Sequence, residues 1–216
     1  MKNINMHVMK RLIRVALGLG LMGFAHDTFA ETHAMIQAMR SSSETNVFVS
    51  QCVEGEYGAF TKFRSGEKDT AAESRIWRGY GFRNTLGLEL MKFTQFSVSH
   101  TFVNMRSKAD SLENIHGSRF TGELKLVFAA PIGNLEAGGG FLGSRYDYQR
   151  QLDNADYLAS GYFYSLGVNY FMSSRVSIFS QGKMNRENLV RNAGSAEVSN
   201  IKTETSSVGM GFSLWI

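Results

Sequence analysis

The stretch VGMGFSLWI, residues 208–216, ends the chain and decides the fold. Every second residue in it is large and apolar, and the residues between them are small or polar apart from Trp215. A period of two sends successive side chains to opposite faces, so the stretch predicts a β-strand with one apolar face. The apolar members are Val208, Met210, Phe212, Leu214 and Ile216.

The same alternation recurs upstream, in residues 162–170 and 120–128. Scanning the chain for it gives eight runs, each long enough to cross a membrane as a tilted strand of about 9–11 residues. The pattern therefore predicts an all-β fold, an eight-stranded antiparallel up-and-down transmembrane β-barrel over residues 46–216. The runs are 47–64, 76–91, 94–106, 118–130, 134–148, 157–171, 175–187 and 201–216.

The predicted connections alternate between short and long. Those at 89–94, 130–134 and 172–175 are short, and Pro131 falls in one of them, where no ladder hydrogen bond is lost. The longer, polar ones lie at 65–75, 107–117, 150–156 and 188–200. Short turns at one end and long loops at the other are typical of outer-membrane barrels.

The first thirty residues predict a secretory signal peptide. A basic stretch through Arg14 precedes an apolar run from Val15 to Ala25, and residues 28–30 resemble a cleavage site. The apolar run is too short for a membrane-spanning helix, which needs about 20 residues. We expect cleavage after Ala30, with Ala25 as the alternative. Residues 31–45 show no period and predict an exposed N-terminal segment.

Composition narrows the function classes. The formal charge is +4, but the first thirty residues carry most of the excess, so nothing favours nucleic acid as a partner. Cys52 is the one cysteine, which excludes an internal disulfide and reads as a small strand residue. Neither His33 nor His100 nor His116 has metal-ligand spacing to Cys52 or to carboxylates, so we expect no metal and no cofactor.

Residues 46–216 resemble the small eight-stranded outer-membrane barrels, the group that includes the OmpA transmembrane domain and OmpX-like proteins. The resemblance is architectural. It implies a location in the Gram-negative outer membrane, with both termini in the periplasm and lipid around the wall. It also implies that the apolar residues of the last strand form an assembly signal read by the barrel insertion machinery. Ile216 stands where this group usually has a terminal aromatic residue.

The rival fold is a soluble exported barrel, such as a lipocalin-like carrier, with its apolar face turned inward. Besides loop length, aromatic placement favours the membrane barrel, because two aromatic belts imply two water interfaces. The aromatic residues near the predicted loop ends are Trp77, Tyr80 and Tyr148. Those near the predicted turn ends are Tyr170, Phe171, Phe212 and Trp215.

The face opposite the apolar one carries charges of both signs. Eight strands enclose an interior just wide enough for side chains, so we expect these charges to pair and to plug the barrel. A structural ion-pair network is favoured over a conduction path. The predicted members are Glu54, Glu56, Lys62, Arg83, Glu89, Glu123, Lys125 and Lys183.

Two histidines need separate interpretations. His116 and Ser118 resemble the catalytic pair of outer-membrane lipid A deacylases, with Glu123 as a candidate orienting acid. Arg119 replaces the asparagine that follows in that family, and we favour packing at a loop end over catalysis. His100 would face lipid if its strand alternates regularly, so either a bulge shifts the strand or the histidine meets a partner.

The favoured function is therefore non-enzymatic: a plugged outer-membrane barrel whose loops serve adhesion, surface interaction or envelope integrity, with an unknown extracellular partner. The alternatives are a lipid A-modifying hydrolase, or a narrow channel or carrier for a small apolar ligand.

Overall fold

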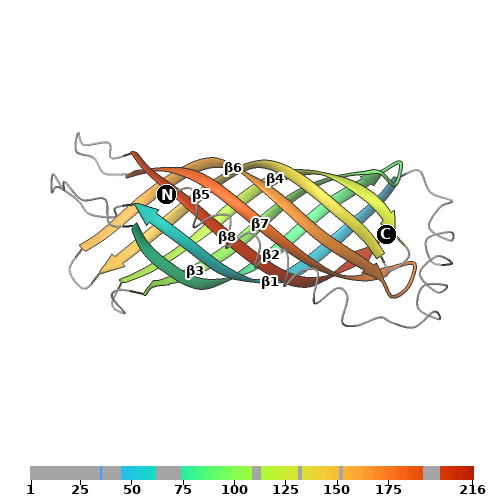
Figure 1. The fold of residues 1–216 in the computed structure, drawn as a ribbon, viewed down its shortest axis with the longest axis horizontal. Coiled ribbons are helices and arrows are strands. Elements are labelled where there is room, and N and C mark those ends of the chain that lie inside the picture. The colour runs from blue at the N-terminus through green and yellow to red at the C-terminus, as the bar shows by residue number, and fades with distance from the viewer. Residues whose placement is uncertain are drawn as a thin grey trace.

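The computed structural model describes Met35 and residues 45–61, 74–108, 113–130, 133–150, 153–191 and 200–216. The described chain forms one closed antiparallel barrel in which each strand pairs with the next and β8 closes on β1 (Figure 1). No helix among these residues has the length and apolarity needed to cross a membrane. The strands are β1 (Thr45–Thr61), β2 (Ser74–Leu90), β3 (Thr94–Ser107), β4 (Glu113–Ala130), β5 (Gly133–Arg150), β6 (Asp153–Phe171), β7 (Val176–Arg191) and β8 (Asn200–Trp215).

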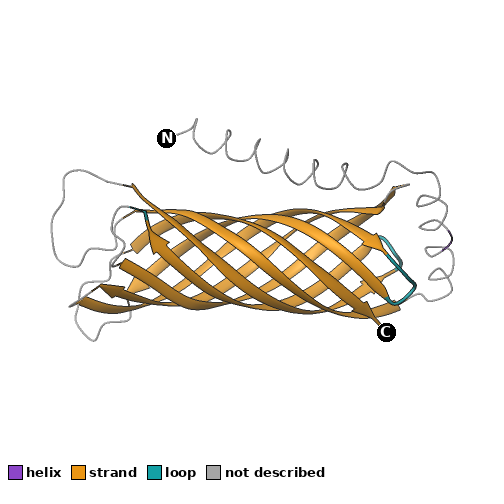
Figure 2. Ribbon diagram, turned by 90° about the horizontal axis from the view of Figure 1, so that it is seen from below, coloured by secondary structure: helices purple, strands orange, loops and turns teal. Residues whose placement is uncertain are grey.

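The predicted eight-stranded barrel is confirmed, and its two ends differ. We call the end with the connections 91–93, 131–132 and 172–175 the turn end, and the opposite end the loop end. The barrel is a long cylinder of tilted strands with these two ends at its extremes (Figure 2). Backbone hydrogen bonds join Val47 and Ile216 in both directions, so the first and last strands meet at the turn end. Pro131 and the predicted signal peptide lie outside the described residues.

The apolar face of the strands points outward. On β4, for example, Phe120 is 61% exposed and Leu124 is 55% exposed. Glu123, the residue before Leu124, points to the other face and is 2% exposed. The same alternation runs along β3, where every second residue is buried. A water-soluble barrel of the lipocalin kind has the reverse arrangement, because its apolar side chains fill the inside. An apolar outer wall around a polar interior requires apolar surroundings.

Several strands extend further toward the loop end than the sequence predicted. β4 begins at Glu113, inside the predicted loop 107–117, and β5 and β6 leave only residues 151–152 between them. The expected long loop at 150–156 is therefore wrong. These strand ends carry polar residues on their outer face, such as Arg145 and Asp156, and their lack of an apolar period made them look like loop.

The strand pairing is regular around His100 and along the glycine-rich part of β5. Asn84 pairs with His100, and His100 pairs with Phe120, without a bulge in either ladder. The glycine-rich segment from Gly138 to Leu142 also keeps continuous pairing with β4 and β6. A bulge therefore does not account for His100, and its side chain stays on the outer face.

Candidate functional site

An apolar cluster fills the inside of the barrel at the loop end. Its side chains come from six strands, and five of them are completely buried. Trp77 and Tyr148 meet edge to face with their ring centroids 6.2 Å apart. This cluster, the loop-end plug, fills the interior at its level with closely packed side chains, and buried polar residues such as Ser107, the register partner of Trp77, lie beside it. Its members are Trp77, Val103, Met105, Ile115, Tyr146, Tyr148, Tyr157, Ala159 and Leu189.

A smaller apolar cluster, the turn-end plug, closes the opposite end. Phe48, Phe171 and Trp215 pack together, with centroid distances to Trp215 of 4.7 Å and 5.2 Å. The indole nitrogen of Trp215 donates a 2.8 Å hydrogen bond to the hydroxyl of Ser177. The ring is thus fixed inside the barrel by one polar and two aromatic contacts.

The predicted aromatic belts are therefore wrong for most of their members. Tyr80 and Phe212 do lie on the outer face, at 62% and 45% exposed. Four of the other side chains point inward, because their positions have the parity of the polar face, and a narrow barrel fills its interior with large rings. These inward members are Trp77, Tyr148, Phe171 and Trp215. Tyr170 is buried too, but it shares the outward parity of Tyr164 and pairs with the exposed Ile178.

Between the two plugs lies a charged layer, whose part nearest the loop end centres on Arg119. Its guanidinium contacts the carboxylates of Glu56 at 2.9 Å and Glu187 at 3.3 Å. It also donates to the hydroxyl of Tyr146 at 3.0 Å, and that hydroxyl lies 2.9 Å from Glu187. Ser144 donates a further 2.8 Å bond to Glu187. One cation thus contacts two buried carboxylates. Glu187 receives further hydrogen bonds, whereas the second oxygen of Glu56 has no hydrogen-bond partner.

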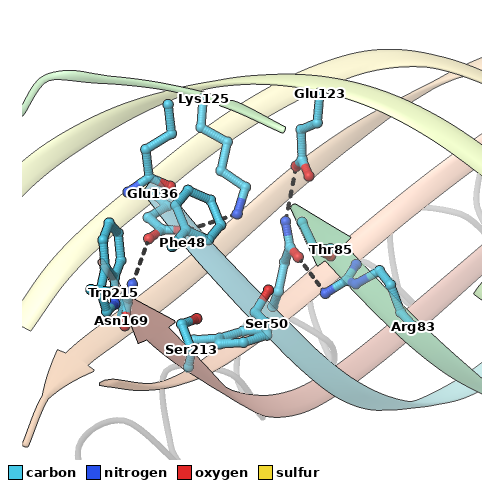
Figure 3. A pocket seen from close by; sticks show the side chains of 13 residues that line it. Phe48, Ser50, Arg83, Thr85, Glu123, Lys125, Glu136, Asn169, Ser213 and Trp215 are labelled. Atoms are coloured by element: carbon cyan, nitrogen blue, oxygen red, sulfur yellow. Dashed lines mark hydrogen bonds and ion pairs between the residues drawn. The ribbon is translucent and has the colours of Figure 1, made fainter. Parts of the chain in front are cut away.

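A second part of the layer lies closer to the turn end and links Arg83 to Glu123. Arg83 pairs with Glu54 at 2.6 Å and donates to Gln181 at 2.7 Å. Gln181 in turn donates to Glu123 at 2.9 Å, a chain of contacts visible in Figure 3. Lys183 lies 3.4 Å from Glu123 and 4.7 Å from the ring centroid of Phe163. Each buried charge here has an opposite charge or an amide within contact distance.

The third part completes the layer beside the turn-end plug. Lys125 pairs with Glu136 at 2.8 Å, and Asn169 donates to the same carboxylate at 3.1 Å (Figure 3). Glu89 accepts from Gln95 at 3.1 Å and from Asn46 at 3.3 Å.

The structure places seven of the eight predicted charged residues inside the barrel. Their side chains are all buried, but they do not form a single cluster, because Glu56 belongs to the group around Arg119 and Glu89 binds amides. Lys62 lies outside the described residues. The buried charged residues concerned are Glu54, Glu56, Arg83, Glu89, Glu123, Lys125 and Lys183.

A small cavity lies between the turn-end plug and the charged layer. It is lined among others by Phe48, Glu123, Lys125 and Trp215, and its volume is about 20 Å³. A water molecule needs about 10–15 Å³ measured in this way, so the cavity has room for roughly one. It is too small for a ligand or for a continuous water path.

The lipid A deacylase resemblance receives little geometric support. His116 and Ser118 alternate on the outer face of β4, and their cross-strand partners on β5 are Asp147 and Arg145. Glu123 is buried inside the barrel, so it lies on the opposite face of β4 and does not orient His116. Among the described residues no hydrogen bond joins His116 to Ser118 or to Asp147, whose carboxylate instead lies 3.8 Å from Arg145. A catalytic serine and its general base would share a hydrogen bond of about 2.6–3.2 Å.

We expect Ser118→Ala to leave lipid A unchanged. Mass spectrometry of lipid A from cells making the parent or the variant, with cells lacking the chain as the reference, measures this directly. If lipid A lacks an acyl chain in the parent cells but keeps it in the Ser118→Ala cells, the chain is a hydrolase instead.

The remaining candidate residues occupy unremarkable positions. Cys52 is a buried free thiol that points inward beside the charged layer. No cluster of three or more His, Cys, Asp or Glu side chains in the described part of the chain could hold a metal. The alternating apolar residues of β8 lie on the outer wall, where Met210, Phe212 and Leu214 are about half exposed.

A closed eight-stranded barrel with an apolar wall and a filled polar core defines the class: the chain has the fold of the small outer-membrane β-barrels. No protein-family model matches the chain, and no curated protein matches its sequence.

Solved structures do match, at low sequence identity. Neisserial surface protein A superimposes with a TM-score of 0.57 at 12% identity, covering 77% of this chain and 96% of its own. OprG from Pseudomonas aeruginosa gives 0.53 at 9% identity, with 81% and 96% covered. The outer-membrane protein AlkL, solved in lipid bilayers, gives 0.56 at 9% identity, with 81% and 91% covered. At such low identity these likenesses establish the fold alone.

Proposed function

We propose that this chain is a non-conducting barrel of the Gram-negative outer membrane that presents its loop end at the cell surface. The observation that carries the proposal is the filled interior: an apolar plug at each end, with the paired charges of the layer between them. A channel needs a continuous polar path, and a carrier needs a cavity of ligand size. The 20 Å³ cavity provides neither.

The outer face at the loop end supports a surface role. Beyond the apolar part of the wall, Arg145 lies 3.2 Å from Asp156 across the β5–β6 pair, and Arg186 lies 3.2 Å from Glu204 across the β7–β8 pair. These exposed pairs contribute little stability. They form a hydrophilic rim with charges of both signs on the strand ends. Such a rim suits contact with a polar partner at the cell surface, in adhesion or in maintaining the envelope.

Orientation follows from the same proposal. The described barrel starts and ends at the turn end, where Val47 and Ile216 are hydrogen-bonded. Export through a cleaved signal peptide and insertion by the barrel machinery would leave this end in the periplasm and the loop end outside. Outer-membrane lipid would then be the partner of the apolar wall.

Planar-bilayer recording tests the closed interior. Purified protein reconstituted into bilayers should show no steady conductance above that of the protein-free membrane, because both apolar plugs exclude water. SDS gels of the same sample, on which a closed barrel shifts mobility only after boiling, verify that the protein is folded. Reproducible, long-lived conductance steps from such a sample would refute the non-conducting barrel and favour the channel.

A further inference from the structure

Three polar side chains form a row on the outer face of β1, β2 and β3. Gln51 pairs in register with Asn84, and Asn84 pairs with His100. Along each strand the next outward residues on both sides are apolar, so this polar row is set into an apolar surface. The flanking residues are Val49, Val53, Phe82, Leu86, Val98 and Phe102, each more than 40% exposed.

The polar row lies near the middle of the apolar wall. Asn84 stands six positions before Leu90, the last residue of β2, and Met91 and Phe93 in the following turn are also exposed and apolar. Six residues of a strand tilted by about 45° rise about 14 Å, roughly half of an apolar band about 25 Å tall. The short amide side chains of Gln51 and Asn84 therefore reach neither water interface. Polar groups at this depth are costly when lipid covers them.

The row keeps hydrogen-bonding capacity that the barrel does not use. Gln51 donates to the amide oxygen of Asn84 at 3.3 Å. Within the described strands this is the one side-chain hydrogen bond of the row, so the Asn84 amide nitrogen, the Gln51 oxygen and the His100 ring nitrogens have no side-chain partner. The His100 ring is held flat against Phe120, with centroids 4.3 Å apart, and edge-on to Phe102 at 4.4 Å. The row is thus an ordered set of unused donors and acceptors.

We propose that the outer face of β1–β3 is a homodimer interface, in which the Gln51–Asn84–His100 rows of two copies hydrogen-bond to each other. Copies inserted in the same orientation are related by a two-fold axis along the membrane normal, which keeps every residue at its depth. Because the strands are tilted by about 45°, each row is inclined to the membrane plane, and the rows of the two copies cross near Asn84. Because amides and a neutral imidazole both donate and accept, the row is complementary to itself.

The apolar side chains around the polar row also fit a second copy of the chain. The six flanking side chains lie above and below the row on all three strands, so a second copy would pack apolar against apolar there while satisfying the polar groups between. A different membrane protein would need polar groups at this same depth. Lipid chains offer no hydrogen-bonding group at all.

Thiol cross-linking at matched positions tests the interface. In a Cys52→Ser background, Leu86→Cys places a thiol beside the row, and Leu166→Cys places one on β6, on the opposite wall at similar depth. Both leucines are about half exposed, so both thiols are accessible to a short bis-maleimide. With purified chain in phosphatidylcholine vesicles, we expect a cross-linked dimer from Leu86→Cys and only background from Leu166→Cys.

A second variant tests whether the polar row itself holds the two copies together, as opposed to chance collisions between barrels. Adding Gln51→Leu, Asn84→Leu and His100→Leu to Leu86→Cys should weaken association roughly tenfold, as expected for losing about 1.4 kcal/mol of hydrogen bonding. The boiling-dependent gel shift confirms that each variant is folded. Equal cross-linking at both positions, no dimer at Leu86→Cys, or an unchanged dimer in the leucine variant overturns the proposal. A cross-link to another protein in outer membranes, with none in vesicles, overturns it in favour of that partner.

Discussion

Arg119→Leu should destabilise the barrel by about 3–5 kcal/mol, the usual cost of removing one partner from a buried ion pair. Arg119 is 3% exposed and contacts both Glu56 and Glu187, so its loss leaves two carboxylates facing each other without a cation. The loop-end plug on one side and the rest of the charged layer on the other keep water from replacing the lost guanidinium. Denaturant unfolding of the reconstituted protein, followed by the loss of the boiling-dependent gel shift, measures the change.

Arg145→Leu is the matched control, because this arginine also contacts two carboxylates. Its side chain is 62% exposed, and its contacts with Asp147 and Asp156 are screened by water. We expect a change within about 0.5 kcal/mol there. Adding Glu56→Gln and Glu187→Gln to Arg119→Leu should recover part of the loss, since neutral amides need no counter-ion. Equal effects at Arg119 and Arg145 would mean that the interior pairs do not hold the barrel together.

The architecture was predictable because lipid and a narrow interior impose opposite demands on alternate residues. On β4, Phe120, Leu124 and Leu126 must be apolar, and the residues between them must fit among other interior side chains. A strict period of two then marks each strand without any motif. The period fades beyond the apolar band, which is why the loop-end parts of β4, β5 and β6 looked like loops.

For the large aromatic residues, residue type alone misleads about which face of the barrel they occupy, whereas the alternation along the strand gives the face of Trp215 correctly. Trp215 alternates with Leu214 and Ile216, so its position predicts the inside of the barrel. The belt interpretation relied instead on its nearness to a strand end. Aromatic rings suit a membrane interface, but they also fill a narrow interior, and parity separates these two roles.

The pairing inside the barrel was only partly predictable. Glu187 shares the parity of Lys183 on β7, so its inward direction could have been found from the sequence. Its partner could not, since Arg119 reaches it from β4 across the interior, and not from a neighbouring strand. Such contacts depend on strand tilt and stagger, which the residues of one strand do not reveal. Glu136 was missed because the glycines after it obscure the alternation.

Gly140→Ala should block normal closure of the β4–β5 ladder. A Cβ added at Gly140 would overlap the backbone carbonyl oxygen of Gly122 and lie 3.0 Å from the Cα of Glu123 on the facing strand. Backbone atoms of a paired strand cannot rotate away as a side chain can. The ladder must therefore open locally, at a cost of at least about 3 kcal/mol, the upper range for overpacking.

Gly122→Ala is the control that isolates this contact, because a Cβ there meets nothing within 4 Å. Both glycines lie at the same place in the β4–β5 ladder, where Glu123 pairs with Gly140 and Gly122 with Phe141. Alanine also loses less conformational freedom on folding than glycine does, so Gly122→Ala should be neutral or slightly stabilising. Refolding yield and denaturant unfolding, read by the boiling-dependent gel shift, compare the two variants. If Gly140→Ala folds as well as Gly122→Ala, then the close approach of β4 and β5 does not constrain this position, and the wall tolerates a wider strand spacing than the structure has.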